Sequence, residues 1–301
     1  MVAEQGRVGK IVSHLGVAVE VQFDDGERRP VRVRRKSGHV VGDLVRVVED
    51  ELLRQPRRTE LRRRDGRGGV HLVAANLDLL FIVVAPRPAP PAGFLDRAIV
   101  AARAAELKPF LLCNKTDLDS AAELLQSLQQ TYGALLPVLP LSTETGAGLD
   151  ELRAVFGAGL CGAFVGASGV GKSSLLNALI PQSRLKTAPV SDFTGIGTHT
   201  TTVATLHPLP DGGELVDTPG FLDFGLVDQS VEEIARFFPG FEAAAAESCR
   251  FRDCRHQSEP GCAVRGLVEQ GVIPKERYQA YGPLLEEAQA WQLARQRQGW
   301  R

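Results

Sequence analysis

The 301-residue sequence contains no uninterrupted apolar run that approaches the length of a membrane span, so we expect no membrane-spanning helix. Its first residues, Met-Val-Ala-Glu-Gln-Gly, lack the basic and then apolar segments of a secretory signal peptide. Cysteine is scarce, with five residues, and three of them cluster with a histidine, which indicates metal binding in a reducing compartment. We therefore expect a cytoplasmic protein of two or three domains, without membrane contact.

Net charge is also low, at −1, but the charge is unevenly distributed. Residues 1–70 contain 16 Lys and Arg against 11 Asp and Glu, so the rest of the chain is acidic. A basic N-terminal region on an acidic chain indicates a polyanionic partner. Because Phe23 is the only aromatic residue in this region, we expect contact with a nucleic-acid backbone rather than reading of bases.

Residues 1–70 contain short segments rich in β-branched residues and separated by turns, at 8–12, 17–23, 31–34 and 40–48. Four or five such strands fit a small barrel of the oligonucleotide-binding type, with a cationic face formed by alternating basic residues. The segment 54–69 is basic and rich in turn residues, which predicts a linker or a mobile arm. We expect this region to be an RNA-binding barrel.

Beyond residue 70 the pattern changes to alternating strands and helices, which is typical of an α/β fold with a parallel sheet. The apolar segments 79–85, 109–113, 134–141 and 160–165 predict buried strands. Helical spacing predicts helices over 94–106 and 120–131.

The segment from Gly166 to Ser174 has the pattern G-x-x-x-x-G-K-S between an apolar strand and a predicted helix, which identifies a phosphate-binding loop. Its glycines allow backbone N–H groups to surround phosphate oxygens, and the helix N-terminus favours the same anion. We expect Lys172 to reach the β- and γ-phosphates and Ser173 to bind Mg²⁺. The predicted nucleotide-binding residues of the loop are Gly166, Ala167, Ser168, Gly169, Val170, Gly171, Lys172, Ser173 and Ser174.

A second motif, N-K-x-D, follows the predicted strand 109–113 and comprises Asn114, Lys115 and Asp117. The end of a buried strand is where α/β sheets bind ligands. A carboxylate can accept two hydrogen bonds, so Asp117 would select guanine, whose ring N–H and amino group form a donor pair that adenine lacks. Asn114 can bridge the base and the loop, the stem of Lys115 can cover the ring, and Ser142 lies where a second base-contacting loop is needed.

Two polar segments follow that suit a nucleotide-sensing switch. In the first, Thr200 or Thr201 is the candidate ligand of Mg²⁺ and the γ-phosphate, and the pattern does not choose between them. The second is D-T-P-G, in which Asp217 can hold the Mg²⁺ water shell and the N–H of Gly220 can meet the γ-phosphate. Phe221 follows where many such enzymes have a water-orienting Gln, so we hypothesise that His199 supplies the catalytic group.

Near the C-terminus, three cysteines and one histidine fall within 14 residues: Cys249, Cys254, His256 and Cys262. This set suits one tetrahedral zinc ion that is structural rather than catalytic, because all four ligand positions are filled by protein. Several arginines surround the cluster and form a candidate RNA-contacting surface: Arg250, Arg252, Arg255 and Arg265. Segments 231–238 and 274–295 predict helices on either side.

The set of motifs is that of a GTPase, but N-K-x-D precedes the phosphate loop instead of following it. In this order, with the basic barrel and the Cys/His cluster, the sequence resembles the ribosome small-subunit-dependent GTPase A family of circularly permuted GTPases. The resemblance extends to Gly197–Thr202 and to Val264–Tyr281. Two positions depart from the family, Thr198 where a basic residue is common and Thr218 where many members have Ser.

The resemblance implies a circularly permuted P-loop GTPase core with an N-terminal OB-type barrel and a C-terminal zinc-binding helical module. We expect the domains to be residues 1–70, 71–228 and 229–301. The implied activity is GTP hydrolysis with Mg²⁺, stimulated by the small ribosomal subunit and serving late subunit maturation, with rRNA as a partner and a monomeric protein. A GTP-dependent factor for another RNA or RNP, or a slow-turnover switch, is the alternative.

Overall fold

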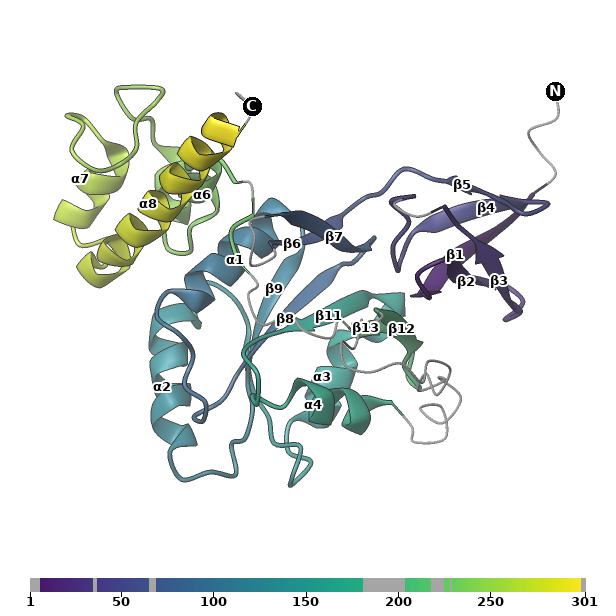
Figure 1. The fold of residues 1–301 in the computed structure, drawn as a ribbon. Coiled ribbons are helices and arrows are strands. Elements are labelled where there is room, and N and C mark those ends of the chain that lie inside the picture. Colours follow the sequence, from purple (N-terminus) through teal and green to yellow (C-terminus); the bar gives the residue numbers. More distant parts are fainter. Residues whose placement is uncertain are drawn as a thin grey trace.

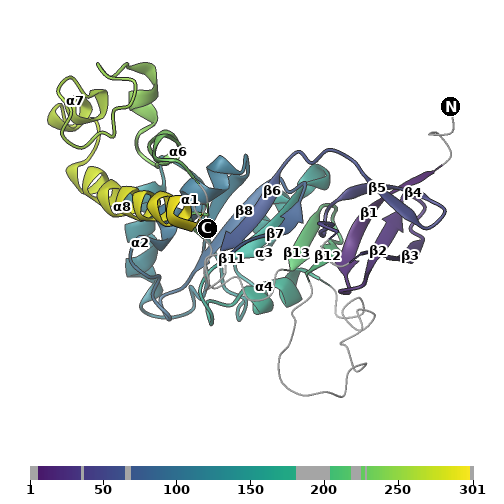
Figure 2. The ribbon, with the colours of Figure 1, turned by 45° about the horizontal axis from the view of Figure 1, so that its top comes forward.

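The computed structural model describes residues 6–34, 37–64, 69–180, 204–217, 225–227 and 229–298. Three parts follow one another across the molecule, and the central α/β part lies between the N-terminal strands and the C-terminal helices in both views (Figures 1 and 2). None of the helices in the described ranges is long and apolar enough to cross a membrane.

The N-terminal part consists of five antiparallel strands, here called the barrel: β1 (Arg7–His14), β2 (Ala18–Phe23), β3 (Arg28–Arg32), β4 (Leu44–Val48) and β5 (Glu51–Arg54). Strand β1 pairs with both β2 and β4, which pair in turn with β3 and β5. Alternate residues point inward and form a small apolar core, consisting of Ile11, Val19, Val21, Phe23, Val31, Val45 and Val47. The prediction of a small β domain is therefore confirmed.

A separate antiparallel hairpin, β6 (Glu60–Arg64) with β7 (Val70–Ala75), follows the barrel. The prediction of a linker over 54–69 is therefore wrong for residues 60–64. One inward side chain on each strand, Leu61 and Ala74, is buried in the core of the central part, and this anchors a strand that is otherwise basic. The two strands of the hairpin lie on either side of the expected domain boundary after residue 70, since β6 ends at Arg64 and β7 runs from Val70 to Ala75.

The central sheet has the strand order β10–β9–β8–β11–β13–β12, and β1 of the barrel continues it beyond β12. Its strands are β8 (Leu79–Val84), β9 (Lys108–Cys113), β10 (Val138–Pro140), β11 (Cys161–Val165), β12 (Thr205–Pro208) and β13 (Glu214–Asp217). All pairs from β10 to β13 are parallel, whereas β12 is antiparallel to β13. Strand β10 is shorter than the predicted 134–141.

Helices cover both faces of this sheet: α1 (Phe94–Ala104) and α2 (Ala121–Tyr132) on one face, and α3 (Leu149–Val155) and α4 (Lys172–Leu179) on the other. A short 3-10 helix, η1 (Gly157–Gly159), precedes β11. Two apolar clusters follow this division. Ile99 and Leu128 belong to the first cluster, whereas Leu152 and Leu175 belong to the second. The sheet therefore holds the described loops that follow β8, β9, β10 and β11 at its carboxyl edge, where α/β sheets bind ligands.

The C-terminal module comprises α6 (Val231–Phe237), the 3-10 helix η2 (Glu242–Ala246), α7 (Ala263–Glu269) and α8 (Lys275–Gln298). A capping box of Ser230 and Glu233 starts α6. The module has its own apolar core, which also includes Val100 of α1. Arg277 of α8 forms a buried ion pair with Asp96 of α1, with 2.6 Å between Nη2 and Oδ1.

Candidate functional site

The phosphate-binding loop connects β11 to α4, as predicted, and Lys172 is the first residue of the helix. Two of its glycines are required by close packing. A Cβ atom at Gly166 would lie 2.3 Å from the carbonyl oxygen of Val83, and one at Gly171 would lie 2.2 Å from Nδ2 of Asn114. Gly171 also has a φ of 100°, which favours glycine. The sequence can therefore form this tight turn only with glycine at these positions.

Lys172 turns its side chain back over the loop, and its Nζ donates to the carbonyl oxygens of Gly166 at 2.7 Å and Ala167 at 2.9 Å. Burial lowers the pKa of Lys172, and the nearby Asp217 carboxylate partly opposes this shift. Burial likewise raises the pKa of Asp217, and Lys172 opposes that shift. The two motifs that carry these residues thus face the same space, in which an anion would favour the charged form of Lys172.

The N-K-x-D motif lies directly against the phosphate-binding loop, although residues 118–165 separate the two in sequence. Asn114 is fully buried, and its Nδ2 donates to the carbonyl oxygen of Val170 at 2.9 Å. The Nζ of Lys115 donates to the carbonyl oxygen of Gly169 at 2.6 Å. Because Oδ1 of Asn114 is buried without a hydrogen-bond partner among the described residues, an acceptor remains there for a ligand or a water molecule.

Asp117 is exposed at the mouth of this site, and it is oriented by the loop that follows β10. The hydroxyl of the buried Ser142 donates to Oδ1 of Asp117 at 2.5 Å and accepts from the N–H of Thr145 at 3.2 Å. Thr116, which we did not single out from the sequence, ties the motif to the same loop through the carbonyl oxygen of Leu141. No group among the described residues donates to the second carboxylate oxygen of Asp117, so this oxygen can accept from a ligand.

The remaining residues of the loop also surround this space. Ser168, Gly169, Ser173 and Ser174 are exposed, whereas Val170 is buried. Other predicted site residues, namely His199, Thr200, Thr201 and Gly220, lie outside the described residues, and so does Phe221. The structure thus brings together the phosphate-binding loop, N-K-x-D, Ser142 and Asp217.

The four predicted zinc ligands come together in the C-terminal module. The ligand atoms of Cys249, Cys254, His256 and Cys262 all lie within 4.8 Å of one another. Nδ1 of His256 is 3.6, 3.7 and 3.4 Å from the sulfur atoms of Cys249, Cys254 and Cys262. Tetrahedral zinc, with its usual bond lengths, places such atoms about 3.5 Å apart, so the donor set fits the ion.

The surroundings of the cluster fix the backbone of its ligands. The hydroxyl of Tyr278 donates to the carbonyl oxygen of His256 at 2.5 Å, and the N–H of Ala263 donates to the sulfur of Cys249 at 3.3 Å. Burial raises the pKa of the Cys254 thiol to about 12. Because a metal ligand must be a thiolate, ion binding would release this proton.

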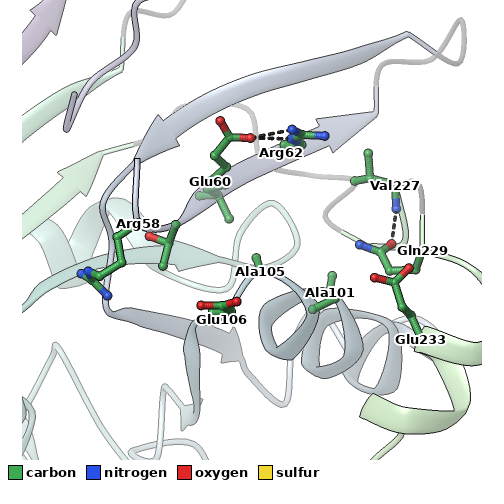
Figure 3. Close-up of a pocket in the computed structure, with 12 residues that line it drawn as sticks. Arg58, Glu60, Arg62, Ala101, Ala105, Glu106, Val227, Gln229 and Glu233 are labelled. Atoms are coloured by element: carbon green, nitrogen blue, oxygen red, sulfur yellow. Dashed lines mark hydrogen bonds and ion pairs between the residues drawn. The ribbon is translucent and has the colours of Figure 1, made fainter. Parts of the chain in front are cut away.

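A different pocket, with a volume of about 250 Å³, lies between the β6–β7 hairpin, α1 and the start of the C-terminal module (Figure 3). Four of its five charged side chains have partners: Arg58 pairs with Asp78, Arg62 pairs with Glu60, and Glu233 caps α6; the fifth is Glu106. It lies apart from the phosphate-binding loop and has none of the nucleotide motifs, so we assign no ligand to it.

Comparison with known proteins agrees with this geometry. A family model described as RsgA GTPase matches residues 54–227. A protein of Pseudomonas fluorescens named small ribosomal subunit biogenesis GTPase RsgA is 41% identical over 293 residues, which cover 93% of this chain and 85% of the relative. A protein of the same name from Pseudomonas aeruginosa is also 41% identical, with the same coverage.

Two solved structures share the fold. YjeQ from Thermotoga maritima matches with a TM-score of 0.74 and 32% identity, covering 94% of this chain and 98% of that protein. YloQ, described as a circularly permuted GTPase, matches with a TM-score of 0.69 and 25% identity, covering 95% and 96% of the two chains. The predicted permuted GTPase core is thus confirmed, and its nucleotide requires Mg²⁺. From its motifs, its fold and these relatives, the chain belongs to the RsgA GTPase family.

Proposed function

We propose that this GTPase is stimulated by the small ribosomal subunit, binds rRNA and assists a late step of small-subunit maturation. The proposal rests on the junction between the N-K-x-D motif and the phosphate-binding loop. At this junction Asn114 and Lys115 contact the loop, and Asp117 of the same motif lies beside them. That junction suits a guanine nucleotide, and the relatives that match nearly the whole chain are named for small-subunit biogenesis. The protein would act in the cytoplasm as a monomer.

In the proposed mechanism, the chain binds the phosphates and orients them. Lys172 is already directed over the loop, and its ammonium group would move from the carbonyl oxygens of Gly166 and Ala167 to the β- and γ-phosphates. The N–H groups of the loop and the start of α4 would stabilise the charge that develops on the transferred phosphoryl group. Asp117 would accept one guanine donor at each of its carboxylate oxygens, and the hydroxyl of Ser142, which also donates to Oδ1, would hold the carboxylate in place.

Ser173 and Asp217 would hold the Mg²⁺ ion that accompanies GTP. Ser173 carries a hydroxyl and Asp217 a carboxylate, and Mg²⁺ prefers such oxygen ligands. The half-buried carboxylate of Asp217 accepts no hydrogen bond from the described residues. When bound, the ion neutralises charge on the β- and γ-phosphates. We retain Thr200 or Thr201 as a further ligand, Gly220 as a γ-phosphate contact and His199 as the residue that orients water.

Zinc would be a structural component of the C-terminal module, since its four protein ligands leave no open position. The barrel and this module would contact rRNA from the two ends of the molecule. We also keep the proposed domains, a barrel in residues 1–70, the GTPase in 71–228 and the zinc module in 229–301.

The test of this function compares GTP hydrolysis by the purified protein alone, with small subunits and with large subunits. We expect strong stimulation by small subunits only. Stimulation by neither subunit would contradict the proposal and favour the alternative, a GTP-dependent factor or slow-turnover switch on another RNA.

The guanine assignment has a separate test in the variant Asp117→Asn. The amide presents a donor where guanine needs an acceptor, so we expect GTP affinity to fall at least tenfold while affinity for xanthosine triphosphate rises. The measurement is competition against a fluorescent nucleotide, and Asp119→Asn, an exposed neighbour, is the matched control. Unchanged GTP affinity in Asp117→Asn would remove the assignment.

A further inference from the structure

Strand β12 lies between the barrel and the strand that carries Asp217. On one side β12 pairs with β13 over four residues, and on the other it pairs with β1 of the barrel. The barrel is thus joined through a single intervening strand to the strand that ends at the nucleotide site.

The pairing places three polar residues in one row across these strands. Thr205 of β12 is opposite Asp217 of β13 and also opposite Ser13 of β1. Residues that are directly opposite in a sheet project from the same face, so these side chains share the face on which the phosphate-binding loop and α4 lie. Ser13 is 8% exposed, which places the barrel end of the row inside the molecule.

The opposite face of the same strands is held by apolar contact. Val12 of the barrel belongs to the apolar cluster of the central part, together with Leu206 of β12 and Val216 of β13. Its neighbour Ile11 belongs instead to the barrel core. The register of β1 against β2 shifts between Ile11 and Ser13, and such an irregularity redirects a side chain. Strand β1 therefore contributes to both cores.

An ion pair adds a third connection at the other end of β13. The Nζ of Lys10 in β1 is 2.5 Å from Oε2 of Glu214, the first residue of β13, and both side chains are about one quarter to one third exposed. This pair links the barrel directly to the strand that carries Asp217. The other ion pairs that β1 makes with described residues, from Arg7 to Asp25 and to Glu27, stay within the barrel.

We propose that β12 and the Lys10–Glu214 pair couple the barrel to the nucleotide at Asp217, so that the bound nucleotide changes the barrel and a ligand on the barrel changes nucleotide affinity. Lys10 and Glu214 are positioning residues in this proposal, since they act through β13. The coupling is reciprocal by thermodynamic linkage. It rests on the proposed role of Asp217 and needs no particular RNA.

The first experiment is hydrogen exchange of the full-length protein with GDP and with a non-hydrolysable GTP analogue. We expect at least a threefold difference in exchange rate between the two nucleotides for amides of residues 7–23, and no difference in α2, which lies away from β12 (Figure 1). Equal exchange with both nucleotides over residues 7–23 would overturn the proposal.

The second experiment removes the ion pair. In Lys10→Met and, independently, in Glu214→Gln, we expect the nucleotide-dependent difference to fall at least threefold while GDP affinity stays within twofold. The charge exchange Lys10→Glu with Glu214→Lys should restore the difference, whereas Arg7→Met, the matched control, should leave it unchanged. Retention of the full difference in both single variants would show that the pair does not carry the coupling.

These measurements use only protein and nucleotide, so their result is independent of stimulation by ribosomal subunits. If small subunits fail to stimulate hydrolysis but exchange over residues 7–23 still depends on the nucleotide, the proposed function fails and the coupling stands. If stimulation occurs without that dependence, the coupling fails and the function stands.

Discussion

Both flanking modules contact the central part, but the barrel does so through backbone pairing as well as side chains, and the C-terminal module does so through side chains on α1. The barrel extends the sheet with β1 and adds backbone hydrogen bonds, such as the one from the N–H of Ala75 to the carbonyl oxygen of Val41 at 2.9 Å. The C-terminal module docks on α1 through charged and aromatic groups, with Arg277 and Asp96 at the centre.

The difference matters because backbone pairing fixes register, whereas side-chain contacts permit alternative packing. A one-residue slip of β1 would turn Val12 out of the central core and Ile11 into it. The C-terminal module has no such register, and its position depends on a few strong contacts.

The largest expected effect is the loss of order in the C-terminal module when its zinc ion is removed, which should leave the barrel and the central part intact. Cys254→Ser removes one of four ligands, and structural zinc sites contribute about 10 kcal/mol or more to folding in small domains. We expect zinc content to fall from one ion per chain to near zero, with rapid hydrogen exchange in α6, α7 and α8 and preserved nucleotide binding.

The matched control is Cys113→Ala, because Cys113 is buried in the central part and is not a ligand. Elemental analysis should find one zinc ion in this control. One ion per chain in Cys254→Ser would contradict the ligand assignment.

The next largest effect is expected from Arg277→Met, which breaks the contact between the C-terminal module and α1. Within the part of the chain that the structure describes, the variant leaves the buried Asp96 carboxylate with the Tyr132 hydroxyl as its one donor, at 2.9 Å. We expect the free energy of unfolding to fall by about 3 kcal/mol, as is usual when one partner of a buried pair is removed. Urea titration measures this change.

The double variant Arg277→Met with Asp96→Asn should recover most of the loss, since no buried charge then remains. A loss below about 1 kcal/mol in the single variant would mean that the pair is more hydrated than its burial implies.

On the barrel side, Val12→Ala tests whether one strand serves two cores. Val12 is 2% exposed, so truncation should cost about 2 kcal/mol in the free energy of unfolding. We expect faster hydrogen exchange in β12 as well as in β1. Val19→Ala, at a fully buried site in the barrel core, should leave exchange in β12 unchanged. Equal effects of the two variants on β12 would contradict the division of the cores.

The smallest effect is expected from Trp291→Leu at the far end of α8. The guanidinium of Arg64 lies 3.8 Å from the Trp291 ring centroid and also donates to the carbonyl oxygen of Val227 at 3.0 Å. Such a cation–π contact contributes about 1 kcal/mol. A double-mutant cycle with Arg64→Met should give a coupling energy of this size, and additive losses would show that the ring and the guanidinium do not interact.

The meeting of the phosphate-binding loop with the N-K-x-D motif could be predicted from the sequence because both motifs are local. The residues from Gly166 to Ser173 predict a turn without help from the rest of the chain. The apolar strands that precede the two motifs place both at the carboxyl edge of the same parallel sheet. The contact between Asn114 and Val170 was also expected in kind, as a bridge from the N-K-x-D motif to the loop.

Contacts between distant segments were not predictable in the same way. The strands of the β6–β7 hairpin contain three arginines, Arg62 to Arg64, and one histidine, His71. Its buried side chains, Leu61 and Ala74, are placed by the core that they enter and not by a pattern in their own segment. Asp96 and Arg277 are ordinary charged residues of two helices until the fold brings them together. Ser13 and Thr205 likewise lie opposite each other only because of the register of β1 against β12, which neither segment indicates by itself.

The pairing of β1 with β12 also has a consequence for solubility during synthesis. Without β1, the edge of β12 would expose unpaired backbone groups next to the buried Leu206 and Val216, which is the kind of edge that recruits strands from other chains. Because the barrel precedes the central part in the chain, it can fold first and be ready to cover this edge as the sheet forms. The barrel would then guard the nascent GTPase core against aggregation.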